Sequence, residues 1–78
     1  MKIEVLGTGC ARCSKLEAMA RAAADAAGVN YELEHVRDIT AIVQRGVLST
    51  PALAIDGKVV ISGRMPSEAE LAALLSST

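Results

Sequence analysis

The alanine-rich segment from Ala11 to Ala27 constrains the fold of this chain more than any other feature. Its apolar residues recur at spacings of three and four, which predicts a helix with one buried face. These residues are Cys13, Leu16, Ala20, Ala23 and Ala27. Gly28 follows at the position where glycine commonly ends a helix. Strand-like segments lie on both sides of this helix, so we expect it to connect two parallel strands of one sheet.

Four short segments have the alternation or β-branching of strands. The first runs from Lys2 to Leu6 and the second from Val29 to Val36. The clean alternation of the second predicts an edge strand with one wet face. The third and fourth, Ala52 to Ile55 and Val59 to Ile61, flank Asp56-Gly57, a strong hairpin signal.

Two shorter helices are predicted in the second half of the chain. Asp38 can cap the first, which ends at Gly46. Pro66 and Ser67 open the second, with Glu70 at capping-box spacing from Ser67. Each helix carries one apolar stripe, and we expect the second helix to bury its stripe. The stripes are Ile39, Ile42 and Val43 in the first helix and Leu71, Leu74 and Leu75 in the second.

The predicted order of elements is therefore βαβαββα. A parallel βαβ unit followed by an antiparallel hairpin gives a four-stranded mixed sheet with helices on both faces, a three-layer α/β/α sandwich. The 78 residues form a single expected domain, residues 1 to 78. A second stable core would need roughly 50 residues of its own.

Composition and charge exclude several classes of function. The formal net charge is -1 and the two signs are interleaved, so we expect no nucleic-acid partner. No apolar run approaches the roughly 20 residues that span a bilayer, so we expect no membrane partner. The apolar stretch from Ile3 to Leu6 contains Glu4 and is too short for a signal peptide. A cytoplasmic protein is the resulting expectation.

The two cysteines, Cys10 and Cys13, are the main functional clue. In a reducing compartment a Cys-x-x-Cys pair is more often catalytic or metal-binding than structural. Cys10 stands where the long helix begins, and Arg12 adds positive charge in the same turn. Cysteines in such positions can have pKa values lowered to about 3.5–7.5. Cys13 falls on the buried face, so we interpret Cys10 as a nucleophile and Cys13 as the resolving thiol.

Metal binding is the main alternative interpretation of this loop. The run from Gly7 to Cys13 is also similar to the loop of heavy-metal-associated copper chaperone domains. Those domains run βαββαβ and end on a strand, whereas this chain is predicted to end on a helix. They usually carry methionine two residues before the first cysteine, where Thr8 stands here. A redox-inert interaction module is a third possibility.

Three motifs taken together resemble the thioredoxin superfamily, in particular its small glutaredoxin-like or redox-active disulfide proteins. They are Gly7 to Cys13, Gly46 to Leu53, and Gly63 followed by Pro66-Ser67-Glu68. The resemblance implies a cis bond between Thr50 and Pro51, beside the cysteines, and a groove where Thr50 binds an extended substrate segment. We assign Arg12, Thr50 and Pro51 to this groove. The implied partners are a thiol–disulfide reductase and a disulfide substrate, with no cofactor.

The chain also departs from its better-known relatives. It has no tryptophan, Ala11 and Arg12 separate its cysteines, and no buried aspartate is evident behind them. The segment from Ser62 to Met65 replaces the glutathione-binding turn of glutaredoxins, so a glutathione site is not supported. His35 has no cysteine or acid at motif spacing, and we expect it to be a structural or surface residue rather than a ligand or base.

Overall fold

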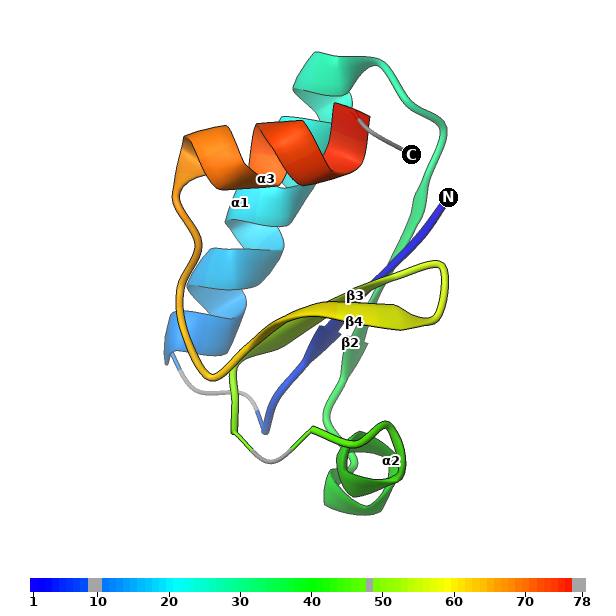
Figure 1. Cartoon of the computed structure of the whole chain (residues 1–78), viewed down its shortest axis with the longest axis vertical. Helices are drawn as coiled ribbons and strands as arrows, with labels where there is room; N and C mark the ends of the chain where they lie inside the picture. Colours follow the sequence, from blue (N-terminus) through cyan, green and yellow to red (C-terminus); the bar gives the residue numbers. More distant parts are fainter. Residues whose placement is uncertain (9–10, 48, 77–78) are drawn as a thin grey trace.

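The computed structural model describes residues 1–8, 11–47 and 49–76 (Figure 1). The order of elements is βαβαββα, as predicted, and the last element is a helix. The elements are β1 (Lys2–Leu6), α1 (Ala11–Ala27), β2 (Glu32–Val36), α2 (Ile39–Gln44), β3 (Ala52–Ile55), β4 (Lys58–Ser62) and α3 (Glu68–Ser76). Among the described residues, no helix has the length and apolar character needed to span a membrane.

The four strands form one mixed sheet in the order β2-β1-β3-β4. β1 pairs in parallel with β2 and antiparallel with β3, and β3 pairs antiparallel with β4. β2 is an edge strand, as expected, but it begins at Glu32 rather than Val29. Lys2 of β1 pairs with Glu32, so the two strands begin at the same level of the sheet.

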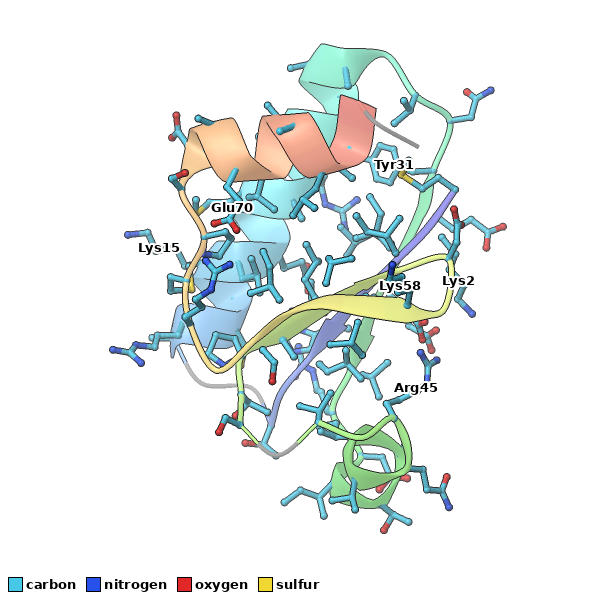
Figure 2. All side chains as sticks on the ribbon, in the orientation of Figure 1. Lys2, Lys15, Tyr31, Arg45, Lys58 and Glu70 are labelled. Carbon is cyan, nitrogen blue, oxygen red and sulfur yellow. The ribbon has the colours of Figure 1, made fainter. Side chains whose placement is uncertain are left out.

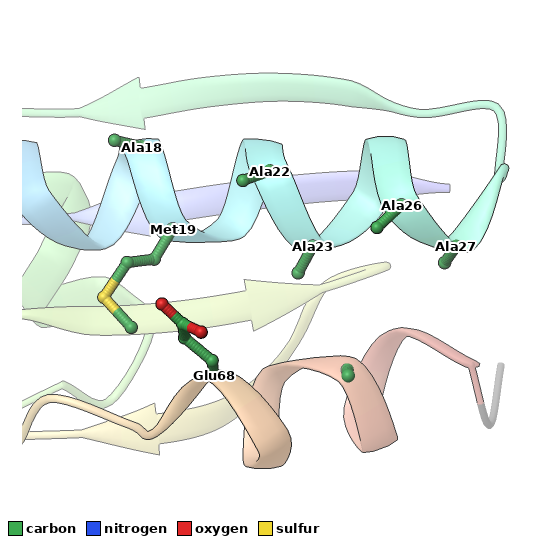
Figure 3. A pocket seen from close by; sticks show the side chains of 8 residues that line it. Ala18, Met19, Ala22, Ala23, Ala26, Ala27 and Glu68 are labelled. Atoms are coloured by element: carbon green, nitrogen blue, oxygen red, sulfur yellow. The ribbon is translucent and has the colours of Figure 1, made fainter.

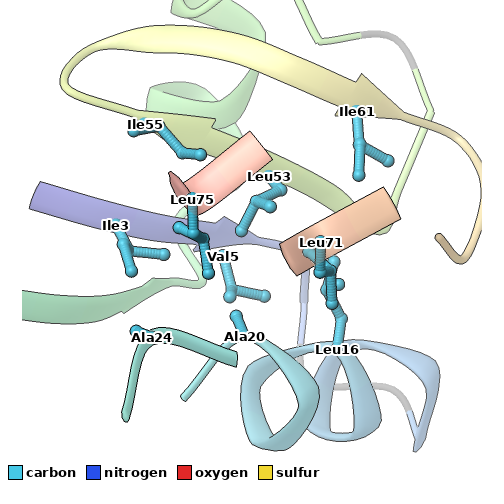
Figure 4. Packing of buried hydrophobic residues seen from close by; sticks show 10 residues of the cluster. All are labelled: Ile3, Val5, Leu16, Ala20, Ala24, Leu53, Ile55, Ile61, Leu71 and Leu75. Carbon is cyan, nitrogen blue, oxygen red and sulfur yellow. The ribbon is translucent and has the colours of Figure 1, made fainter. Parts of the chain in front are cut away.

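The sheet lies between two helical layers, which confirms the predicted fold class. α1 and α3 cover one face over the main core shown in Figure 4, and α2 covers the other over a smaller core. The main core contains Ile3, Val5, Leu16, Ala20, Ala24, Leu53, Ile55, Ile61, Leu71 and Leu75. The smaller core contains Leu6, Ile42, Val47, Ala52 and Ala54. Alternate residues of β1 and β3 point into the two cores, so both central strands are buried on both faces.

Only one residue of the apolar stripe of α2 is buried. Ile42 is 3% exposed, whereas Ile39 and Val43 are 63% and 59% exposed. α2 has only six residues, fewer than two turns, so a single residue of the expected stripe lies against the sheet. Its predicted N-cap is confirmed, since the carboxylate of Asp38 accepts a hydrogen bond from the Thr40 N–H at 3.0 Å.

The predicted buried stripe and capping box of α3 are each confirmed in part. Leu71 and Leu75 are fully buried, but Leu74 is only partly buried at the edge of the main core. The Ser67 hydroxyl accepts a hydrogen bond from the Glu70 N–H at 3.1 Å, which is half of the predicted capping box. The Glu70 carboxylate does not complete the box, because it pairs with the Arg64 guanidinium at 2.8 and 2.6 Å.

Candidate active site

The segments that carry the predicted site residues meet at one end of the sheet. These are the residues that follow β1, the first turn of α1, the segment before β3 and the turn after β4 (Figure 1). The Gly7 N–H donates to the Val36 carbonyl at 2.9 Å, which extends the pairing of β1 and β2 into this end. We call the segment from Gly7 to Cys13 the cysteine loop, and the chain enters it from the buried centre of the sheet.

Cys13 lies against Gly7 with no room for another atom between them. A Cβ placed on Gly7 would lie 2.1 Å from the Cys13 Sγ, 3.2 Å from its Cβ and 3.8 Å from the Cβ of Thr50. Gly7, Cys13 and Thr50 are therefore close neighbours, although up to 43 positions separate them in the sequence. Cys13 is fully buried on α1, as expected of a resolving thiol. Arg12, which precedes it, is exposed.

The predicted nucleophile, Cys10, lies outside the described residues. What the structure describes on either side of it is Thr8, which is exposed, and Ala11, where α1 begins. In the sequence, Cys10 directly precedes Ala11.

The Thr50–Pro51 peptide bond is cis, the geometry that the resemblance implied. Pro51 is buried and Thr50 is exposed. The end of β4 holds this segment, because the Gly63 N–H donates to the Pro51 carbonyl at 3.0 Å. Gly63 has a φ of +74°, and a Cβ at this position would lie 2.8 Å from the Cβ of Ser49. Only glycine fits here without displacing the segment that carries Pro51.

A buried carboxylate that the sequence analysis did not identify lies on β1. Glu4 is 2% exposed, and its carboxylate accepts a 2.5 Å hydrogen bond from the Arg45 guanidinium at the C-cap of α2. This hydrogen bond, followed by the Coulomb attraction of the carboxylate, raises the pKa of Arg45. A signal for Glu4 did exist in the sequence. In a sheet that is covered by helices on both faces, as the sequence predicts here, a central strand is buried on both faces, so an acid within it is buried too.

His35 has an acidic partner that motif spacing could not reveal. Its Nδ1 lies 2.9 Å from the Glu17 carboxylate on α1, and its side chain is 8% exposed. Within the described part of the chain, no hydrogen-bond partner reaches its buried Nε2. This contact joins the edge strand β2 to α1, which agrees with the expected structural role.

An apolar groove of about 610 Å³ runs between α1 and α3, away from the cysteine loop. Figure 3 shows Met19, Ala23 and Glu68 between the two helices. Alanines make up most of the remaining lining, and neither Cys13 nor Pro51 contributes to it. In residues 1–8, 11–47 and 49–76, no three histidine, cysteine or acidic side chains are grouped closely enough to hold a metal ion.

The fold, with its cis-bonded Pro51 beside the start of the first helix, defines a thioredoxin-like protein. Comparison with known proteins gives the same class. Residues 1–76 match the family profile described as "Thioredoxin domain". The chain is 41% identical over 76 residues to a protein named thioredoxin from Methanothermobacter thermautotrophicus, covering 97% of this chain and 99% of that relative. It is 32% identical over 75 residues to a protein named thioredoxin from Methanocaldococcus jannaschii, covering 96% and 86% respectively.

The chain belongs to the thioredoxin family and is a thiol–disulfide oxidoreductase. The βαββαβ order of the copper chaperone domains is not the order observed.

Proposed function

We propose that this protein exchanges electrons with protein or small-molecule disulfides through the dithiol of Cys10 and Cys13. The observation that carries the proposal is the packing of the Cys13 Sγ against Gly7, beside Thr50 and the cis-bonded Pro51. This packing sets the second cysteine of the motif next to the segment that we expect to bind substrate.

The reaction conserves atoms and electrons in two exchange steps. The Cys10 thiolate attacks one sulfur of the substrate disulfide, whose S–S bond breaks as the mixed disulfide forms. The substrate sulfur that leaves in this step takes up, through solvent, the proton that Cys10 lost when it formed its thiolate. Cys13 then loses its proton and attacks the Cys10 sulfur, the mixed-disulfide bond breaks, and the second substrate sulfur takes up that proton. The substrate leaves as a dithiol, having gained the two electrons that the Cys10–Cys13 pair has lost.

The two cysteines have different roles because their surroundings differ. Cys10 immediately precedes the helix start, where backbone N–H groups without helical partners favour a thiolate. Cys13 is fully buried, which restricts it to attack on a sulfur already held at Cys10. Arg12, Thr50 and Pro51 form the substrate groove in this proposal.

The proposal requires no cofactor but does require two partners. A cellular thiol system, such as a thioredoxin reductase, a glutathione pool or a lipoamide dithiol, must reduce the oxidised protein. A disulfide substrate must then accept the electrons. Such a cycle suits the cytosol, where thiols are kept reduced.

Differential alkylation tests the assignment of roles. Reduced protein treated with a small alkylating reagent at mildly acidic pH should be labelled first at Cys10. Equal labelling rates, or faster labelling of Cys13, would contradict the assignment.

A second experiment tests the activity itself. The chain should reduce insulin when a dithiol system is supplied, and Cys10→Ser should abolish turnover. Cys13→Ser should instead accumulate a mixed disulfide with substrate at Cys10. Stoichiometric metal on freshly isolated protein, with no exchange in any reducing system, would replace this proposal with the metal chaperone.

A further inference from the structure

Three exposed basic residues surround the end of the sheet that carries the site. Arg12 and Lys15 lie on the first two turns of α1. Arg37 lies on the other side and follows Val36, whose carbonyl bonds to Gly7. Figure 2 shows Lys15 projecting from α1 on the side away from Lys2 and Lys58. We call these three residues, Arg12, Lys15 and Arg37, the basic rim.

The charges of the basic rim are not neutralised within the described part of the molecule. None of its three side chains makes an ion pair there. Four other basic residues do pair with carboxylates, namely Lys2 with Glu34, Arg21 with Glu17, Arg45 with Glu4 and Arg64 with Glu70. Two acids lie near the rim: Asp38, whose carboxylate accepts a hydrogen bond from the Thr40 N–H, and Glu17, whose carboxylate pairs with Arg21 and contacts His35. The rim therefore presents more positive than negative charge.

The distribution of acids reinforces this polarity. Asp25, Glu32 and Asp56 lie toward the other end of the molecule, at the end of α1, the start of β2 and the β3–β4 turn. Since the whole chain has a formal charge of -1, the part outside the rim is net negative. The dipole of the 17-residue helix α1 adds positive potential at the rim end.

We propose that the partner of this site is a protein segment that carries acidic residues beside its disulfide. The proposal rests on the thiol–disulfide exchange proposed above and specifies the chemistry of its substrate. The positive charge of the basic rim attracts a negatively charged partner. Electrostatic attraction of this kind raises association rates by roughly 10- to 1,000-fold. The effect weakens in salt, because the screening length falls from about 30 Å at 0.01 M to about 3 Å at 1 M.

Two disulfide peptides of identical core sequence provide the test. One carries three aspartates beside its cysteine and the other carries three lysines. We expect the reduced protein to reduce the acidic peptide at least roughly tenfold faster at 0.01 M ionic strength. The two rates should converge to within a few-fold at 1 M.

A matched pair of charge-reversal variants assigns the preference to the basic rim. Lys15→Glu/Arg37→Glu reverses two rim charges and leaves both cysteines intact, so it should lose or invert the preference for the acidic peptide. Lys2→Glu/Lys58→Glu makes the same change in net charge at a distance from Lys15 and should keep the preference. The measured quantity is the ratio of the rates for the acidic and the basic peptide. A variant that is simply less active lowers both rates and leaves this ratio unchanged.

The outcomes separate this inference from the function on which it rests. Equal rates for the two peptides, or equal effects of the two double variants, would overturn the acidic-partner inference and leave disulfide exchange standing. Failure to reduce either peptide, together with failure on insulin, would overturn both.

Discussion

Replacing Gly7 with alanine should separate catalytic geometry from stability in this protein. The new Cβ would lie 2.1 Å from the Cys13 Sγ, whereas ordinary contact begins at 3.4 Å. The sulfur or the strand must therefore move by about 1.3 Å, the difference of these distances. Overpacking of this kind costs about 1–3 kcal/mol of stability. Displacement of a reacting atom by about 1 Å can cost about 100-fold in rate.

Two assays measure these effects on the same samples. Urea denaturation gives the free energy of unfolding, and reduction of a disulfide substrate gives the rate of exchange. Gly28→Ala is the matched control, since Gly28 has a φ of +69° and no heavy atom lies within 4 Å of its added Cβ. That control should lose about 1–2 kcal/mol from backbone strain and keep its rate of exchange, corrected for the folded fraction.

A double-mutant cycle identifies the atom responsible. Cys13→Ala removes the Sγ and leaves the Cβ, so Gly7→Ala should cost less stability in that background than in the parent protein. An equal cost in both backgrounds would refute the contact between Gly7 and the sulfur. A Gly7→Ala protein with an unchanged rate of exchange would refute the argument that this packing positions Cys13.

Three further predictions concern the rest of the fold. Arg45→Ala should destabilise the protein by somewhat less than the about 3–5 kcal/mol lost on breaking a buried pair, because Arg45 is itself partly exposed. Arg45→Met should lose stability for the same reason. In urea denaturation the double variant Arg45→Met/Glu4→Gln should recover much of the stability that Arg45→Met loses. Leu71→Ala should cost about 2–5 kcal/mol and Leu74→Ala clearly less in the same assay, because only Leu71 is fully buried. The hydrogen bond from Arg64 lowers the pKa of Glu70 from its ordinary value of 4.5. The stabilisation by this hydrogen bond is therefore present above pH 4.5 and is lost as the pH falls through the lower pKa of Glu70 in the folded protein. Denaturation midpoints measured from pH 6 to pH 2.5 should show this loss in the parent protein and not in Glu70→Gln.

Most of the fold was predictable because local patterns specify it. Alternation and the Asp56-Gly57 turn each depend on a few neighbouring residues, and the strands formed where those patterns lie. The spacing within α1 correctly predicts the helix and the burial of Cys13, Leu16 and Ala20, but Ala24 is buried in place of Ala23 and Ala27. The length of β2 was not predictable in this way, because it depends on the pairing with β1. The exposed residues Ile39 and Val43 fit an apolar stripe in the sequence, and only the docking of α2 shows that Ile42 alone is buried.

The candidate site was predictable in its residues but not in its contacts. Cys10, Cys13, Thr50 and Pro51 were selected from motifs and a resemblance, and the structure brings Cys13 and Thr50 together around Gly7. No local pattern indicates that contact. The pair of Glu4 and Arg45 was missed for the same reason, since 41 positions separate the two residues.

The central strand β1 connects these separate observations. Gly7, which continues the pairing of β1, sets the position of the Cys13 sulfur, and Glu4 of β1 binds Arg45 at the end of α2. β1 and its continuation therefore contact α1 at Cys13, the segment before β3 at Thr50, and the end of α2 at Arg45. A charged residue in the middle of this strand costs desolvation, and its ion pair offsets that cost only while α2 stays in place. Loss of Arg45 should therefore affect disulfide exchange as well as stability, which distinguishes this pair from a surface salt bridge.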